Sequence, residues 1–202
     1  MNLAYIRHHL RAALEMARFR GDPMAQFDTT YEGFFRSFWA MAVAAPLMPL
    51  IVIGERAMAT SAAAMKAIPD AAGPLPLTAG YLTFEVASFV LGWLVFPLAM
   101  IPIARLLGIS QRYVPYIVAY NWGACIGIGL SAITSLLFLS GLVPMEVLSF
   151  IFLGILIFSL AYLWRIAHIA LQIGGVMAAG IVLLDIVLSQ FVSIATEMLE
   201  RM

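Results

Sequence analysis

Residues 89–139 read FVLGWLVFPLAMIPIARLLGISQRYVPYIVAYNWGACIGIGLSAITSLLFL, and this stretch decides the fold class of the chain. Its only charged residues are Arg105 and Arg112, which lie in a short gap between two long apolar runs. A helix needs about 20 consecutive apolar residues to cross a hydrocarbon core of roughly 30 Å. The stretch therefore predicts two membrane-spanning helices joined by a short basic connection.

The composition of the whole chain agrees with a membrane protein. Of its 202 residues, 63% are hydrophobic and 11% are charged, and the mean hydropathy is +0.99. A chain of this composition is too apolar for a domain with a water-exposed surface, so its expected partner is the lipid bilayer. Lys+Arg and Asp+Glu balance at 11 each, which gives no basic excess and predicts no nucleic-acid binding.

Five apolar runs predict an all-α integral membrane protein, a bundle of about five transmembrane helices preceded by an amphipathic N-terminal interfacial helix. We expect a cytoplasmic amphipathic segment at 1–33, a transmembrane domain at 34–196 and a short external tail at 197–202. The expected spans are 34–53, 82–104, 113–139, 146–164 and 170–194. The longest loop is expected at 54–81, where the first span continues as a helix to about residue 67 before a proline-rich stretch ends it.

The start of the first span carries a helix-capping pattern. Thr29 is followed three residues later by Glu32, just before the apolar run, which is typical of a capping box. Pro46 and Pro49 lie inside the span, and each removes a backbone donor, so we expect a kink there.

The arrangement of basic residues predicts the orientation. Cytoplasmic flanks of membrane helices retain Lys and Arg. With the N-terminus inside, only Arg56, Lys66 and Arg201 lie outside, whereas the cytoplasmic side holds Arg7, Arg11, Arg18, Arg20, Arg36, Arg105, Arg112 and Arg165. We therefore expect a cytoplasmic N-terminus and an external C-terminus, in a membrane of the bacterial inner-membrane type.

The N-terminal residues form an amphipathic pattern without the layout of a secretory signal. Apolar residues recur at helical spacing from Leu3 to Ala17, and Arg7, Arg11 and Arg18 follow another ridge of the same helix. Two interpretations are compatible with this pattern. The helix lies on the membrane surface with its arginines among anionic headgroups, or it packs on the cytoplasmic ends of its neighbours.

Polar residues deep in the spans are the candidates for function. Asp185 is the only acid expected at mid-membrane, about 20 Å from the inner boundary, and Asn121 lies on the third span. One interpretation makes Asp185 a proton or cation carrier, with Ser189 and Gln190 as further ligands. The other makes it a protonated acid that is hydrogen-bonded to a neighbouring helix and transports nothing.

Small residues suggest where helices approach closely. Gly123, Gly127 and Ser131 follow one another at four-residue spacing on the third span, and Gly174 and Ala178 form a matching pair on the last. The spacing predicts that these two helices pack on each other or mediate oligomers. The indole N–H groups of Trp93 and Trp122 lie too deep for the interface and are expected to find partners in the bundle.

Motifs of known chemistry are missing from the sequence. It contains no HExxH, no glycine-rich phosphate loop, no CxxC and no nucleophile elbow, and its lone cysteine, Cys125, lies inside an apolar run. We therefore expect no enzymatic activity, no cofactor and no metal site.

The layout of five spans, a cytoplasmic N-terminal segment, short turns and an external C-terminus resembles the Yip family of small membrane proteins. Arg112, Tyr113, Pro115 and Tyr116, which open the third span, add to the resemblance. The resemblance implies a non-enzymatic scaffold that associates with other membrane proteins and shapes the bilayer, and it carries over no functional residues.

The leading hypothesis from the sequence is a non-enzymatic membrane scaffold that associates through its small-residue faces, as a homo-oligomer or within a larger membrane complex. The alternative is a small ion- or proton-coupled transporter or channel subunit in which Asp185 titrates.

Overall fold

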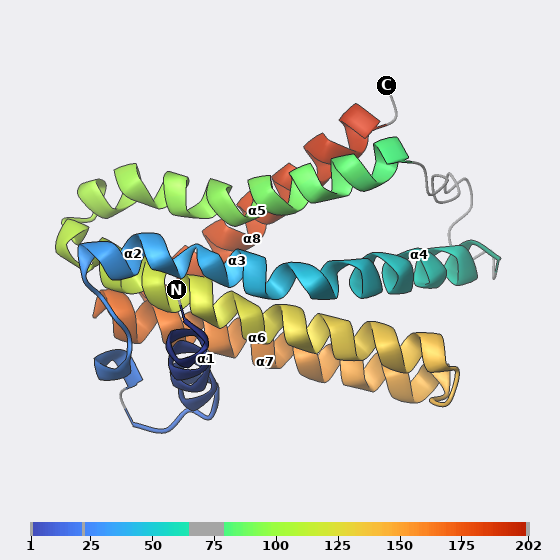
Figure 1. Cartoon of the computed structure of the whole chain (residues 1–202), viewed down its shortest axis with the longest axis horizontal. Coiled ribbons are helices and arrows are strands. Elements are labelled where there is room, and N and C mark those ends of the chain that lie inside the picture. The colour runs from blue at the N-terminus through green and yellow to red at the C-terminus, as the bar shows by residue number, and fades with distance from the viewer. Residues whose placement is uncertain (1, 22, 65–78, 201–202) are drawn as a thin grey trace.

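The computed structural model of the chain describes residues 2–21, 23–64 and 79–200, which are mainly helical and contain no strand. Five segments are long and apolar enough to cross a membrane: Tyr31–Ser61, Phe84–Leu106, Ser110–Ser140, Met145–Leu171 and Gly175–Thr196. This confirms the prediction of an all-α bundle of about five membrane helices. The α-helices shown in Figure 1 are α1 (Leu3–Ala17), α2 (Tyr31–Ser37), α3 (Trp39–Ala44), α4 (Met48–Ala64), α5 (Ala79–Leu106), α6 (Tyr113–Ser140), α7 (Met145–Leu171) and α8 (Gly175–Glu200).

The first span is assembled from three helices in sequence, α2, α3 and α4. A 3-10 turn at Ala45–Leu47 separates α3 from α4, because Pro46 cannot donate a backbone hydrogen bond there. The N-cap of α2 is Thr30, whose hydroxyl accepts a hydrogen bond from the backbone N–H of Gly33 at 3.0 Å. The capping box expected at Thr29 is therefore wrong by one residue, and Glu32 forms an ion pair with Arg36 instead.

Helix ends differ from the spans expected from hydropathy. The fourth helix continues to Leu171, seven residues beyond 164, and Gln172 ends it in the left-handed conformation (φ 55°). The last helix begins at Gly175 and continues to Glu200, so residues 197–200 are helical rather than a tail. The helix that precedes the long loop extends to Ala64, while the proline-rich part at 68–78 lies outside the described residues, as do the predicted external charges at 201 and 66.

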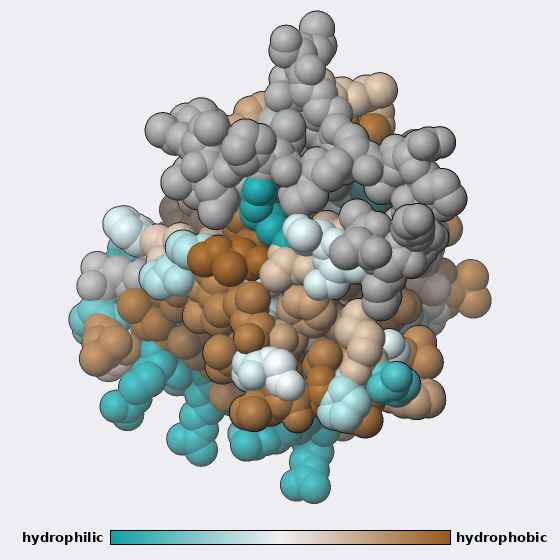
Figure 2. All heavy atoms as spheres, turned by 90° about the vertical axis from the view of Figure 1, so that its right-hand side faces the viewer, coloured by the Kyte–Doolittle hydropathy of each residue, from teal (hydrophilic) through white to brown (hydrophobic). Residues whose placement is uncertain are grey.

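Helix α6 is the centre of the bundle (Figure 1). It packs against α1, α2, α3, α4 and α7, whereas α8 packs between α5 and α7. Helix α1 lies across α6 and α7 rather than along them. Figure 2 views the molecule from the end that carries the α6–α7 turn: the surface is largely apolar, and hydrophilic side chains project along the edge on which α1 lies.

The densest core lies in the half of the bundle next to α1. Its fully buried large side chains include Phe96, Met100, Trp122, Ile166 and Leu171. The half of α7 near Met145 is mostly exposed, which is expected where lipid is the solvent. The buried polar side chains Asn121 and Asp185 lie in the packed half.

Candidate functional site

Asp185 is buried between helices and bonded to one of them. It lies ten residues after Gly175, which places it about 15 Å from the start of α8, closer to that end than the sequence predicts. The hydroxyl of Tyr120 on α6 donates a hydrogen bond to Oδ1 of Asp185 at 2.9 Å, and Asp185 is 7% exposed. The ring of Phe96 packs on Tyr120 with centroids 4.7 Å apart and brings α5 to the same place. The geometry makes Asp185 a polar link between α8 and α6.

The expected further ligands of Asp185 do not accompany it. Ser189 and Gln190 are exposed on the surface of α8. In a bilayer their side chains face lipid or another protein, not a common centre with Asp185.

Asn121 is the centre of a second polar chain, separate from Asp185. The indole N–H of Trp93 on α5 donates to its Oδ1 at 3.1 Å, and its Nδ2 donates to the Ser37 hydroxyl on α2 at 2.8 Å. Ser37 in turn donates to the carbonyl oxygen of Phe34 at 2.7 Å. Asn121 and Ser37 are 0% exposed, so buried hydrogen bonds join three spans. Both the oxygen and the nitrogen of the Asn121 amide have partners.

The small residues of α6 and α8 do not face each other. A Cβ on Gly123 would lie 2.6 Å from the Cδ1 of Ile166 and 3.1 Å from the hydroxyl of Tyr162, both on α7. Gly127 and Gly174 have nothing within 4 Å of such a Cβ among the described residues, and Ser131 is exposed. Ala178 is buried, in a helix that packs on α5 and α7.

Two spanning helices approach each other closely at a glycine that the pattern of small residues does not mark. A Cβ on Gly54 of α4 would lie 2.4 Å from the Cβ of Ser135 and 3.0 Å from its Cα, on α6. Gly54 stands alone in its segment, without a second small residue four positions away on the same side that would mark a strip. Its role depends on the partner helix, which the sequence of α4 does not show.

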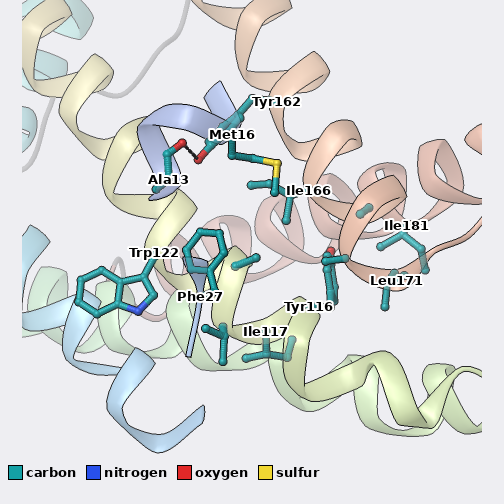
Figure 3. Close-up of a cluster of buried hydrophobic side chains, with 14 of the residues drawn as sticks. Ala13, Met16, Phe27, Tyr116, Ile117, Trp122, Tyr162, Ile166, Leu171 and Ile181 are labelled. Carbon is teal, nitrogen blue, oxygen red and sulfur yellow. Dashed lines mark hydrogen bonds between the residues drawn. The ribbon is translucent and has the colours of Figure 1, made fainter. Parts of the chain in front are cut away.

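Helix α1 is docked onto the bundle. Its buried face consists of His9, Ala12, Ala13 and Met16, whereas Leu3 and Leu14 of the expected apolar ridge are exposed. The hydroxyl of Tyr162 on α7 donates to the carbonyl oxygen of Ala13 at 3.1 Å, as Figure 3 shows beside Met16 and Ile166. Small alanines on this face let the helix backbone approach α6 and α7.

The basic ridge of α1 points away from the bundle. Arg7, Arg11 and Arg18 are exposed, and Arg18 pairs with Glu15 at 2.6 Å. Packing on the bundle and contact with the membrane surface are therefore compatible with each other, since one face of α1 packs on the bundle while the arginine face stays free for headgroups.

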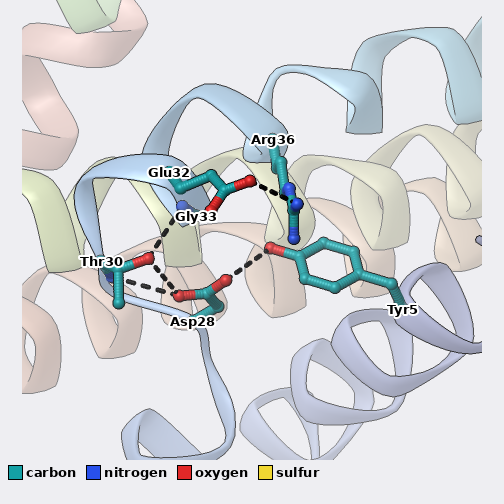
Figure 4. A network of polar contacts seen from close by, with 6 residues as sticks. All are labelled: Tyr5, Asp28, Thr30, Glu32, Gly33 and Arg36. Carbon is teal, nitrogen blue, oxygen red and sulfur yellow. Dashed lines mark hydrogen bonds and ion pairs between the residues drawn. The ribbon is translucent and has the colours of Figure 1, made fainter. Parts of the chain in front are cut away.

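A network of polar contacts ties the N-terminal helix to the start of the first span (Figure 4). The Tyr5 hydroxyl donates to Asp28 at 3.2 Å, and the Thr30 hydroxyl donates to the other oxygen of that carboxylate at 2.6 Å. Arg36 lies over the Tyr5 ring, with 5.5 Å from its Cζ to the ring centroid. The hydrogen bond from Thr30 holds the pKa of Asp28 below its usual value, while burial and the adjacent Asp28 raise the pKa of Tyr5 to about 12.

His9 is a buried histidine of this docking surface. Its Nδ1 lies 2.9 Å from the carbonyl oxygen of Tyr5, and its Nε2 accepts a hydrogen bond from the backbone N–H of Asp28 at 3.1 Å. This pair of contacts requires a neutral ring with its proton on Nδ1. The ring packs on Trp122 of α6, with centroids 5.2 Å apart. Burial lowers the pKa of His9 and outweighs the hydrogen bond to the Tyr5 carbonyl oxygen, which raises it; His8 has a smaller lowering effect and Asp28 a smaller raising one.

Acidification is expected to release α1 from the bundle. Because the docked ring has a pKa below its ordinary value of 6.5, the undocked form binds more protons and docking weakens as the pH falls below 6.5. The stability that Asp28 contributes is lost only later, as the pH falls below 3.8. We expect hydrogen exchange of α1 amides, corrected for intrinsic rates, to rise severalfold between about pH 8 and about pH 5.

The control for this prediction is the neighbouring histidine. His8 is exposed and its Nε2 donates to the carbonyl oxygen of Gln26, so H8Q is expected to keep the pH dependence while H9Q removes it. Equal pH dependence in wild type and H9Q would show that another group controls docking.

Two buried nitrogen atoms have no hydrogen-bond partner among the described residues, the indole Nε1 of Trp122 and the Nε of Arg165. The expectation for Trp122 is therefore wrong, since its ring packs against His9 and Tyr5 while its N–H stays unpaired. Arg165 donates from Nη2 to the carbonyl oxygen of Gly21 at 2.8 Å and lies over the ring of Phe19.

The part of the chain that the structure describes holds no group of three or more His, Cys, Asp or Glu residues placed to bind a metal ion. The thiol of Cys125 lies 3.4 Å from the carbonyl oxygen of Ala40 and is partly buried between α6 and α3.

Comparison of the chain with models of protein families, with curated proteins and with solved structures finds no significant match.

Proposed function

We propose that this chain is a non-enzymatic integral membrane scaffold that associates with itself or with other membrane proteins through lipid-facing helix surfaces. One observation carries the proposal. The deep polar groups Asp185 and Asn121 are both engaged in hydrogen bonds between helices. Such bonds hold a bundle in one arrangement in lipid, where water cannot compete for the polar groups.

The surroundings of Asp185 favour the structural interpretation over the carrier. A site that carries a cation replaces the hydration shell of the ion with several oxygen ligands. At Asp185 the bonded oxygen is that of Tyr120, which donates its proton to the carboxylate, and Ser189 and Gln190 are turned outward. This arrangement supports a link between helices rather than a coordination site.

Exposed surfaces of α7 and α8 supply the means of association. Gly154 and Gly180 are exposed, and a Cβ on either would meet nothing within 4 Å among the described residues. Exposed glycines on lipid-facing helices let another backbone approach closely, as in small-residue packing motifs. The resemblance to the Yip family supports the same role.

The proposed location is a bacterial-type inner membrane with the N-terminus in the cytoplasm and the C-terminus outside. The support is the unequal distribution of arginines along the chain, since Arg7 and Arg11 precede the first span while Arg105 and Arg112 lie beside the second connection, which is on the same side of the membrane as the N-terminus. Helix α1 crosses α6 and α7 in the half of the bundle nearer that connection (Figure 1), and we expect its outward arginines to contact anionic headgroups.

Reconstitution separates the scaffold from the carrier. We expect wild type and D185N to give the same passive proton or sodium flux in proteoliposomes, measured with an internal pH or sodium dye, and the same oligomer size in mild detergent. The substitution is tolerated because the carbonyl oxygen of the new amide side chain would still accept a hydrogen bond from the Tyr120 hydroxyl.

The matched control is Y120F, which removes the donor and leaves the acid. A flux present in wild type and lost in D185N, while circular dichroism and elution volume are unchanged, would contradict the scaffold and establish Asp185 as the carrier.

A further inference from the structure

A cavity of about 240 Å³ lies at the end of the bundle where the N-terminal segment meets the starts and ends of the spans. Its walls come from the turn at Pro23–Gln26, the first residues of α6 and the last residues of α7. Apolar side chains, among them Met24, Pro115 and Ile169, form one part of the lining, and Thr29, Arg112 and Gln172 form the polar part. A hollow lined by both apolar side chains and a few polar groups suits a ligand that has both characters.

The charge in the cavity is positive. Arg112 is the one charged side chain among the described residues that line it, and its guanidinium has no hydrogen-bond or ion-pair partner among them. Asp28, the acid next to Thr29 in the sequence, is not part of the lining, because its carboxylate is bound to Thr30 and Tyr5. An anion in the cavity would therefore meet no competing carboxylate from the lining.

Two further features favour an anion beside Arg112. Helix α6 begins directly after Arg112, so the positive end of its dipole lies at this wall, although the backbone N–H of Tyr113 is bonded to the carbonyl oxygen of Ser110 and Pro115 has no N–H to offer. Gln172 adopts the left-handed conformation that favours glycine, at the point where the chain leaves α7 and lines the cavity. Gln172, with its side-chain amide, and Thr29, with its hydroxyl, line the same cavity as Arg112.

We propose that this cavity binds a phosphate group, with the Arg112 guanidinium as its main contact. The planar guanidinium matches two phosphate oxygens at once, and Gln172 and Thr29 supply neutral donors. The apolar wall then suits the glycerol and first methylene groups of a lipid. The phosphate has two sources with this chemistry, the headgroup of an anionic phospholipid and free inorganic phosphate. The site goes beyond the scaffold role and does not depend on it.

The test uses the full-length protein in detergent and in nanodiscs. Native mass spectrometry with equal amounts of phosphatidylglycerol and phosphatidylcholine measures retained lipid, and a titration with labelled phosphatidylglycerol gives the affinity. We expect R112Q to weaken phosphatidylglycerol binding by about tenfold or more. R112K is expected to weaken it by less, because lysine keeps the positive charge but cannot donate two parallel hydrogen bonds to one phosphate. The matched control is R105Q, since Arg105 is exposed at the same end of the bundle and does not line the cavity.

A second variant acts on the shape of the cavity and not on its charge. Ala25 lines the cavity and is exposed, so A25F is expected to fill the space and reduce binding to the same degree while Arg112 remains. Circular dichroism confirms that each variant is folded.

The source of the phosphate is decided by competition. Retained phosphatidylglycerol that millimolar inorganic phosphate does not displace identifies a lipid headgroup. Inorganic phosphate that binds to wild type and not to R112Q, with no selective retention of phosphatidylglycerol, identifies the free anion. If R112Q, A25F and R105Q all bind both probes as wild type does, the proposal is wrong.

Discussion

Replacing Gly54 by alanine is expected to push α4 away from α6 and destabilise the bundle by about 1–3 kcal/mol, the usual range for overpacking a tight contact. The added Cβ would lie 2.4 Å from the Cβ of Ser135 and 3.0 Å from its Cα. Backbone atoms cannot turn aside as a flexible side chain can. The two helices must therefore separate, which weakens the dispersion contacts that drive helix association in lipid.

The measurement is the midpoint of thermal or SDS unfolding, followed by circular dichroism in a mild detergent. G127A is the matched control, because Gly127 also lies within a spanning helix and its added Cβ would meet nothing within 4 Å in the described structure. Alanine there is expected to be neutral or slightly stabilising, since it has the higher helix propensity. A midpoint for G54A equal to that of G127A would contradict the close crossing of α4 and α6.

Replacing Asn121 by alanine is expected to cost about 2–4 kcal/mol, from an unpaired buried donor and a small cavity. The indole N–H of Trp93 would lose its acceptor at a depth where water cannot replace it, and the link to Ser37 would disappear. S37A is expected to cost less, because it leaves the bond between Trp93 and Asn121 in place.

A double-mutant cycle isolates the hydrogen bond from the change of volume. W93F removes the donor, so the pair W93F and N121A together is expected to cost less than the sum of the two single variants. Unfolding free energies that add within error would show that Trp93 and Asn121 are not coupled, and the buried chain would then not hold α5 to α6.

Hydropathy locates the spans well because lipid imposes a simple requirement on composition. The ends of the helices are harder to predict. Composition places the end of the fourth span at 164, where Arg165 and His168 bring polar groups, yet the backbone of α7 continues to Leu171. A helix ends where its hydrogen bonds end, not where its side chains stop being apolar, and here Gln172 in the left-handed conformation ends it.

The candidate residues can be found from the sequence, but their partners cannot. Asp185 and Asn121 stand out because polar groups are rare at that depth. The partner of each depends on the direction in which side chains leave α6. Tyr120, which bonds to Asp185 on α8, and Asn121, which bonds to Trp93 on α5, are consecutive and point about 100° apart around α6, so they reach different helices. The start of α8 also changes the expected depth of Asp185, since the helix begins at Gly175 and not at 170.

The surface on which α1 docks is likewise not predictable from its sequence alone. The apolar ridge expected between Leu3 and Ala17 is divided, since Ala13 is buried beside His9 and Ala12 while Leu3 and Leu14 are exposed. Exposed leucines next to arginines suit a membrane surface, and the small residues suit close packing on helices. A hydropathy pattern alone cannot separate these two apolar environments.

Water access at Asp185 is the most direct test of the claim that it links helices. D185C, S189C and L142C are made singly in a C125A background and treated with a membrane-impermeant maleimide on intact cells and on opened membranes. Leu142 is the positive control, because it is 86% exposed in the turn between α6 and α7. We predict that L142C is labelled and that D185C and S189C stay inert in folded protein. Labelling of D185C that a candidate cation blocks would contradict the account, because it would place Asp185 on an aqueous route through the membrane.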